Sequence, residues 1–394
     1  MGGRLSWWLL AILASQFLVQ LTVSMTRPVT SYRLLAQGAD AASVGLVAAV
    51  FALPAMFLAL SFGRWSDRRN PGVMLAVGAV LTTVGAFALS RSTSVFGLAG
   101  WTALLGIGHL SQVVGAQSLV AYRFSATDAV TSFGLLTVSG SLGQMCGPLI
   151  GGWLAEAEGG LPTTQSTSLS LTVAALVGLA AVAVAAATVS AKAKGTHDAE
   201  PAAPDSAVTM LRTRGMPAVL LASFGSKGST DLVTAFLPVL GTELGLGARS
   251  VGGLLSLSAG AAILARALMP WLVHRARTEV LLGLSTAISG ACAFGLLVGP
   301  PIAALAGLMI VLGFLLALAQ TVSMVQVASL ASARSKGSAL GMRLASNRAG
   351  QVAIPGLGGV ISGLAGVSAA FGLLGVMMLS IGLVVLRSVP RGET

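Results

Sequence analysis

Residues 134–152 read GLLTVSGSLGQMCGPLIGG, and residues 341–359 read GMRLASNRAGQVAIPGLGG. An offset of 207 residues aligns the two stretches, so that their opening glycines, their prolines and their closing Gly-Gly pairs coincide. The same offset pairs the Ser-Val-Gly run at 43–45 with that at 250–252. One offset therefore predicts two structurally similar halves with matching loop lengths. Transporters built from parallel repeats about an axis along the membrane normal have this organisation.

The composition around these stretches is that of a chain with lipid as its solvent. Of 394 residues, 55% are hydrophobic and 9% are charged, and the mean hydropathy is +0.89. Soluble domains carry about 25% charged residues, so that class is excluded. Because a helix needs about 20 mainly apolar residues to cross a bilayer, the apolar runs predict an all-α membrane protein of twelve spans in two pseudo-symmetric six-helix bundles. The spans are expected at residues 6–29, 42–62, 72–89, 95–121, 129–154, 168–189, 216–240, 250–271, 280–298, 302–331, 338–361 and 366–386.

A polar stretch at residues 190–215 separates the halves. We expect it to be a cytoplasmic linker between an N-terminal bundle, residues 1–189, and a C-terminal bundle, residues 216–394. With the N-terminus inside, 15 Lys and Arg residues fall in cytoplasmic segments and 3 fall outside. This asymmetry predicts a multi-pass protein of the cell inner membrane with both termini in the cytoplasm. The net charge of +11 then mostly orients the chain, and no nucleic acid partner is expected.

The sequence offers no sign of enzyme chemistry. Cys146 and Cys292 lie in apolar segments and suggest neither a disulfide framework nor a metal cluster. No nucleophile with a base, and no paired carboxylates, occur at a catalytic spacing. We therefore expect a protein that is not an enzyme and binds no metal and no cofactor. Its expected partners are the lipid bilayer, a small-molecule substrate and protons.

Charged residues inside the predicted spans are the first candidates for function, because each costs roughly 2.5–3.5 kcal/mol at a helix centre. Asp231 is the one acid placed deep in a span. Lys227 precedes it by one helical turn, so the two side chains can pair on one face. This spacing predicts Asp231 as the proton-carrying carboxyl and Lys227 as its partner. A purely structural ion pair is the alternative interpretation.

Residues 63–70 read GRWSDRRN and lie between the second and third spans. This stretch resembles the signature loop of the major facilitator superfamily, with Gly63, Asp67 and Arg68 at matching positions. The resemblance implies a gating loop on a short cytoplasmic turn. Asn70 and Pro71 depart from the ending of the family's pattern.

The stretch at 134–152 resembles the antiporter motif of the twelve-helix drug:proton exporters in that superfamily. Glycines four residues apart permit close packing of helices, and the proline removes a backbone donor and bends its helix. The resemblance implies a seam that determines which face of the protein opens, and residues 341–359 repeat it with Ile354 before the proline. The seam residues are Gly134, Gly143, Gly147, Pro148, Gly151 and Gly152 in the first half, and Gly350, Pro355, Gly358 and Gly359 in the second.

In superfamily members the first, fourth, seventh and tenth helices line a central cavity, and the resemblance assigns polar residues of these spans to it. The first span places four polar residues on a single face, at spacings of four, four and three. Another family feature is missing, because no arginine precedes Gly106 in the fourth span. The candidate cavity residues are Gln16, Gln20, Ser24, Arg27, His109, Gln112, Ser223, Thr234, Gln320 and Ser323, with Arg343 and Asn347 from the eleventh span.

Together these features predict a proton-coupled exporter of a small organic molecule, a drug or metabolite:proton antiporter that works by alternating access as a monomer. The seam favours antiport, whereas the net positive cavity favours an anionic or zwitterionic substrate, and the sequence leaves this conflict open. A proton-coupled uptake symporter of an organic anion is the alternative. A non-transporting membrane sensor or scaffold is a remote one, because polar stripes on cavity helices would then be unnecessary.

Overall fold

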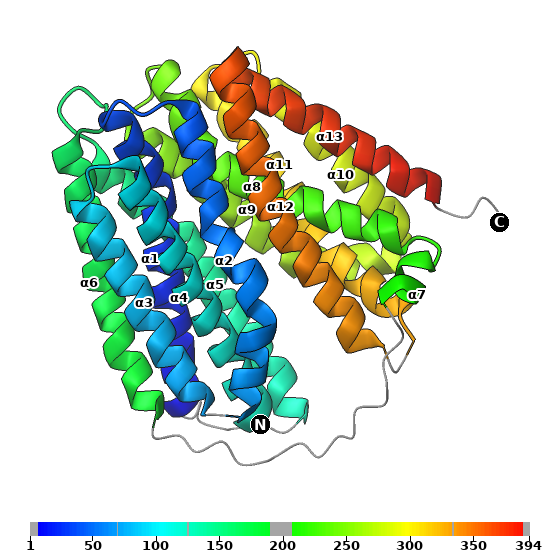
Figure 1. Ribbon diagram of the computed structural model, residues 1–394. Helices are drawn as coiled ribbons and strands as arrows, with labels where there is room; N and C mark the ends of the chain where they lie inside the picture. Colours follow the sequence, from blue (N-terminus) through cyan, green and yellow to red (C-terminus); the bar gives the residue numbers. More distant parts are fainter. Residues whose placement is uncertain (1–6, 69, 124–125, 190–206, 333–334, 389–394) are drawn as a thin grey trace. The chain divides into compact units, whose positions relative to one another are not determined.

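The computed structural model describes residues 7–68, 70–123, 126–189, 207–332 and 335–388 (Figure 1). Within these ranges, the side chains of residues 60, 63, 64, 67, 68, 122–130, 207, 208, 336 and 337 lie outside the description. All regular structure in the described residues is α-helical, which confirms the predicted fold class. The chain forms two compact units: residues 1–197 with 237–256, and residues 198–236 with 257–394.

The helices follow the order of the predicted spans, with one addition. The first unit contains α1 (Trp7–Ala36), α2 (Ala41–Arg68), α3 (Pro71–Arg91), α4 (Val95–Arg123), α5 (Ala126–Ala155) and α6 (Thr164–Val189). The other helices are α7 (Ala207–Arg212), α8 (Met216–Glu243), α9 (Ala248–Arg275), α10 (Thr278–Gly295), α11 (Ile302–Leu330), α12 (Lys336–Ala365) and α13 (Val367–Ser388). The end of α8 and the start of α9 belong to the first unit. The short α7 lies in the stretch expected to be a linker, of which residues 190–206 are outside the described part.

The two units repeat one packing scheme. In the first unit, α3 packs against α4 and α6; in the second, α10 packs against α11 and α13. The offset of 207 residues converts α3, α4 and α6 into α10, α11 and α13. The repeat in the sequence is therefore also a repeat in the structure.

The seam glycines bring helix backbones close together. A Cβ atom at Gly143 of α5 would lie 2.6 Å from the carbonyl oxygen of Phe17 in α1. At Gly350 of α12, a Cβ atom would overlap the backbone of α8. Gly134 and Gly341, which open the two motifs, would have no atom within 4 Å of an added Cβ. Close packing thus begins at the second glycine of each motif.

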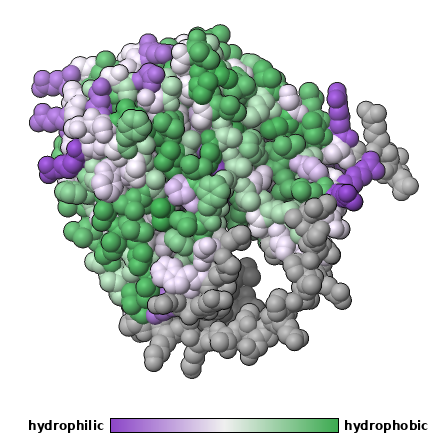
Figure 2. Space-filling view, in the orientation of Figure 1, coloured by the Kyte–Doolittle hydropathy of each residue, from purple (hydrophilic) through white to green (hydrophobic). Residues whose placement is uncertain are grey.

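Ten of the described helices are long and apolar enough to cross a membrane, where twelve spans were predicted. The two long helices outside this set are α8 and α12, with 28 and 30 residues. Both helices are longer than the roughly 20 residues that a span needs, so it is their higher polarity that excludes them from the set of ten. The polar residues of α8 and α12 converge on one another, as described below, and lower the mean hydropathy of both helices. Apolar side chains predominate on the face drawn in Figure 2.

The predicted gating loop is mostly helical, so the expectation of a turn was wrong for residues 63–68. Gly63, Asp67 and Arg68 belong to the last two turns of α2, and their side chains lie outside the described part. No helix-breaking residue occurs until Pro71, which begins α3. Asn70 caps α3, because its Oδ1 accepts a hydrogen bond from the amide of Gly72 at 2.9 Å. The departure from the family's pattern therefore determines where α3 starts.

The turn between α1 and α2 has the same backbone geometry as the turn between α8 and α9. Gly38 and Gly245, 207 residues apart, have φ values of 78° and 67°. In each turn the amide after the glycine donates to the carbonyl five residues earlier, and the glycine amide donates to the carbonyl three residues earlier, at 2.7–3.2 Å. This pattern is the Schellman motif, which requires a left-handed residue and so favours glycine.

The helices after these turns are capped differently. Asp40 caps α2, since its Oδ1 accepts from the amide and the hydroxyl of Ser43 at 2.9 and 2.7 Å. These hydrogen bonds hold the pKa of the Asp40 carboxyl below its usual value. The equivalent position before α9 is Gly247, which has no side chain. There Glu156, from the end of α5, accepts a hydrogen bond from the amide of Arg249 at 2.8 Å. The first repeat supplies its own cap, and the second takes its cap from another helix.

Candidate functional site

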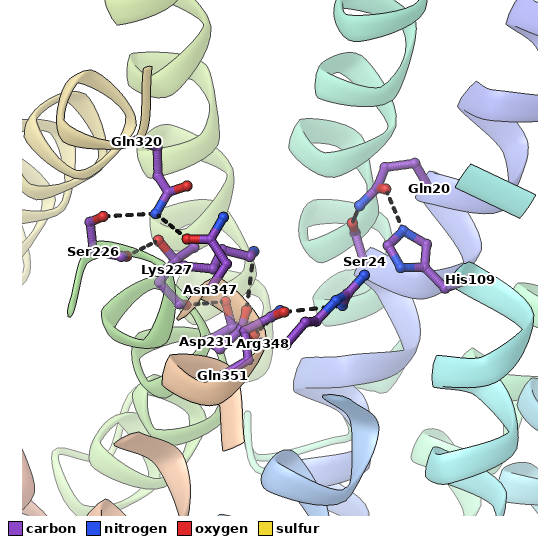
Figure 3. A network of polar contacts seen from close by, with 12 residues as sticks. Gln20, Ser24, His109, Ser226, Lys227, Asp231, Gln320, Asn347, Arg348 and Gln351 are labelled. Atoms are coloured by element: carbon purple, nitrogen blue, oxygen red, sulfur yellow. Dashed lines mark hydrogen bonds and ion pairs between the residues drawn. The ribbon is translucent and has the colours of Figure 1, made fainter. Parts of the chain in front are cut away.

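An ion pair lies among the polar residues of α8. The Nζ atom of Lys227 is 3.6 Å from Oδ1 of Asp231, one helical turn further along (Figure 3). The Asp231 side chain is 1% exposed and that of Lys227 is 31% exposed. A carboxylate in this position is stabilised by its cation and can be neutralised by one proton.

The second oxygen of Asp231 is held by Gln351, a residue that the sequence analysis did not select. Its Nε2 donates to Oδ2 of Asp231, and its Oε1 accepts from Nη1 of Arg348 at 3.0 Å (Figure 3). Gln351 is 3% exposed. The amide therefore links the guanidinium of α12 to the carboxylate of α8. Its position after Gly350 repeats the Gly143-Gln144 pair, which is the one sequence signal that could have indicated it.

A second polar cluster joins α8, α11 and α12 around Arg343. Its Nε donates to Oγ of Ser323 at 3.1 Å, and its Nη2 donates to both oxygens of Gln320, with Oε1 at 3.2 Å. The Nε2 of Gln320 donates in turn to Oγ of Ser226 at 2.7 Å. Ser223 donates to Oδ1 of Asn347 at 2.8 Å. Ser223, Gln320, Ser323, Arg343 and Asn347 thus form one connected cluster.

Neighbouring polar residues of α12 turn toward different partners. Arg343 and Asn347, one turn apart, belong to the cluster around Gln320. Arg348 instead contacts Gln351 beside Asp231. The helical rotation of about 100° per residue requires this separation of Asn347 from Arg348.

The polar residues of the first unit form a network without an acid. Gln112 of α4 donates to Oε1 of Gln16 in α1 at 3.0 Å. Gln20 donates to Oγ of Ser24 at 3.1 Å, and its Oε1 lies 3.1 Å from Nε2 of His109 (Figure 3). Because an amide oxygen only accepts, Nε2 of His109 carries the proton of this bond. Amides, a hydroxyl and an imidazole therefore link α1 with α4.

Arg27 contacts an aromatic ring, and Thr234 forms a hydrogen bond within its own helix. The Arg27 guanidinium stacks over the ring of Phe51 in α2, 4.7 Å from its centroid. Thr234 donates to the Thr230 carbonyl of its own helix at 2.8 Å. Gln326 of α11 is a further residue that the sequence analysis missed. It is 3% exposed, and neither atom of its amide has a partner among the described residues.

Buried polar clusters inside apolar helices are typical of the functional sites of polytopic membrane proteins. A model of the Major Facilitator Superfamily matches residues 12–336, and the chain belongs to this family. The match confirms the resemblance that residues 63–70 and 134–152 indicated. The chain is therefore a multi-pass membrane protein.

Comparisons with known proteins place the chain near drug efflux proteins by sequence. Multidrug resistance protein 1 of Bacillus subtilis (strain 168) is 26% identical over 165 residues, which is 42% of each chain. Quinolone resistance protein NorA of Staphylococcus aureus is 26% identical over 148 residues, 37% of this chain and 38% of NorA. The matches span about two fifths of these relatives' lengths.

A solved structure shows the fold over nearly the whole chain. The crystal structure of the nucleoside transporter NupG aligns with a TM-score of 0.80 at 15% identity, covering 97% of this chain and 100% of that chain.

Proposed function

We propose that the protein is a proton-coupled exporter of a small organic molecule that works by alternating access. Protons move inward as the substrate moves outward. Asp231 is the proton site, Lys227 is its counter-ion, and Arg27 contributes to the substrate site.

The buried ion pair with its amide bridge carries this proposal. Asp231 is 1% exposed, and its two oxygens face a cation and an amide donor. Protonation of the carboxylate removes the attraction that holds Lys227 in place. A substrate that interacts with Lys227 or Asp231 therefore competes with, or assists, the binding of a proton. Such reciprocal coupling is what a proton-driven transporter requires.

The direction of transport rests on two observations. The two relatives described above are named for drug resistance, and the glycine seam at 134–152 packs α5 against α1 as the exporter motif implies. Both favour export over uptake.

Transport by purified protein in proteoliposomes tests the proposal. We expect accumulation of a fluorescent drug against its gradient only when a pH gradient is imposed, and none with Asp231→Asn. Ser229→Ala is a matched control, because Ser229 is buried in the same helix and donates to the Gly225 carbonyl of that helix. Transport that ignores the pH gradient, or that persists unchanged in Asp231→Asn, would show that the proposal is wrong.

An uptake symporter of an organic anion is the second candidate, favoured by two basic residues of α12: Arg343, and Arg348, which is linked to Asp231 through Gln351. It predicts that external acidification drives labelled anion into the liposomes, in the direction opposite to export.

We also propose that the monomer has both termini in the cytoplasm and two halves, residues 1–189 and 216–394, joined by the linker. Single cysteines introduced at positions 3 and 392 in a cysteine-free chain should react with impermeant maleimide only after the cells are opened. Labelling in intact cells would reverse the proposed topology.

A further inference from the structure

Arg343 is the one charged residue of the cluster around Gln320. It is 8% exposed, and its Nε and Nη2 donate to Ser323 and Gln320, which are neutral. No acid whose side chain is described forms an ion pair with Arg343. Its Nη1 amino group donates no hydrogen bond to any described residue.

Arg33 shows what a purely structural arginine looks like in this fold. It is 3% exposed, its Nε and Nη2 donate to the carbonyl of Ser92 at 3.2 and 3.0 Å, and its Nη1 donates to the carbonyl of Thr164 at 2.8 Å. All three nitrogens hold helix ends together. Arg343 keeps one amino group, with two N–H bonds, for another acceptor.

A buried cation without a counter-charge raises the free energy of the folded protein, because the charge has lost its water. A ligand that brings a negative charge next to it lowers that free energy again. Gln320 and Ser323 hold the guanidinium in place, so its free edge is oriented before the ligand arrives. Gln326, three residues after Ser323 on α11, adds a buried amide whose donor and acceptor are both unused. Guanidinium and amide donors together suit a carboxylate or a phosphate.

We propose that Arg343, with Gln326, binds an anionic oxygen group of the transported molecule. The substrate is accordingly an organic anion or a zwitterion that carries a carboxylate or a phosphate, and not a lipophilic cation. Gln320 and Ser323 are positioning residues for this subsite. The inference rests on the proposed transport function but not on the direction of transport or on the role of Asp231.

Binding of simple aromatic probes to the purified full-length protein tests this subsite. Benzoate and phenylphosphate carry the anion, whereas benzyl alcohol and benzyltrimethylammonium are the neutral and cationic controls. A probe that binds only the folded protein raises its thermal midpoint with a dose dependence that gives the affinity. We expect a rise with the two anions alone, an affinity at least tenfold weaker in Arg343→Gln, and an intermediate loss in Arg343→Lys.

Arg33→Gln is the matched control. It removes a buried arginine of the same kind, so it should lower the midpoint without probe but leave the response to phenylphosphate unchanged. Arg343→Gln should lower the midpoint without probe less than Arg33→Gln does, because it also removes an uncompensated charge. An equal loss of stability in both variants, with the anion response preserved in Arg343→Gln, would assign Arg343 a structural role and overturn the inference.

Three further outcomes also test the anion subsite: the first two would overturn it, and the third would leave it standing. Stabilisation by benzyltrimethylammonium alone, or by no anionic probe, would exclude an anion subsite. A response to phosphatidylglycerol in mixed micelles that depends on Arg343, without one to soluble anions, would assign the site to a lipid headgroup. A response to anions in a protein whose transport ignores the pH gradient would leave this inference standing and remove proton coupling.

Discussion

The pair Gln20 and Ser24 in α1 and the pair Lys227 and Asp231 in α8 occupy equivalent positions, 207 residues apart. In both, the first side chain reaches the second across one helical turn, at 3.1 Å in α1 and 3.6 Å in α8. The geometry is shared, but the first pair is neutral and the second is charged. Only the second pair contains side chains that can bind and release a proton. The two halves therefore share the spacing and the contact of the pair, but only the second half has ionisable side chains at these positions.

The same contrast extends to α5 and α12. Arg343 and Arg348 stand where the first half has Leu136 and Ser141. At these equivalent positions the second unit carries charged side chains where the first unit carries neutral ones.

The largest expected effect on stability comes from a substitution in the glycine seam, which occurs in both units. Gly350→Ala forces a Cβ into the backbone of α8, and we expect a loss of about 3 kcal/mol of stability. Gly341→Ala on the same helix meets open space and should stabilise by about 0.5 kcal/mol, because alanine favours helix. Chemical unfolding in detergent measures both. Equal effects of the two variants would contradict the close packing at Gly350.

The next largest effect on stability is expected at the pair Lys227–Asp231, compared with the pair Gln20–Ser24. Lys227→Ala leaves a buried carboxylate without its cation, and we expect a loss of about 2 kcal/mol, reduced by the partial exposure of Lys227. Gln20→Ala removes two neutral hydrogen bonds, to Ser24 and to His109, and should cost about 1 kcal/mol because the sites left behind are partly exposed. Adding Asp231→Asn to Lys227→Ala should recover stability, because the unpaired charge is removed. A double variant less stable than Lys227→Ala would show that the pair is not coupled.

A smaller effect separates Gln351 from its counterpart Gln144. Gln351→Met removes a hydrogen bond to a charged group and should cost about 1.5 kcal/mol, whereas Gln144→Met should cost less than about 0.5 kcal/mol. Since Gln351 positions Asp231, Gln351→Met should also alter the pH profile of transport, and Gln351→Asn should restore part of it. An unchanged pH profile with reduced stability would leave Gln351 a structural role only.

The smallest effect concerns the helix caps. Asp40 has a lowered pKa in the folded protein, so its contribution to stability is present above its usual pKa and is lost as the pH falls through the lowered value. Asp40→Asn keeps an N-cap acceptor but does not titrate, so the wild-type protein should be slightly more stable near neutral pH, and this difference should disappear as the pH falls below about 4. Thermal midpoints between about pH 3 and pH 7 check this. A difference in thermal midpoint that grows as the pH falls would contradict the assigned sign.

Much of the fold could be predicted from the sequence, because apolar spans, seam glycines and the 207-residue offset are local or periodic signals. Asp231 and Lys227 were selected for the same reason, since a charge in an apolar span is conspicuous. Gln351 was missed because a neutral amide in an apolar span costs less free energy than a charge and so is less conspicuous. Its role also depends on how α12 is rotated against α8, which the sequence does not show. The helical end of α2 was missed because a charged run after an apolar span reads as a turn.

The caps of α2 and α9 show that the two halves of the chain are not equivalent. Gly38 and Gly245 form matching Schellman turns, but the helix after the second turn has Gly247 where the first has a capping side chain. The start of α9 belongs to the first compact unit, and Glu156 of α5 caps it. The two halves of the chain are therefore not interchangeable modules, because the second depends on the first for the start of a helix.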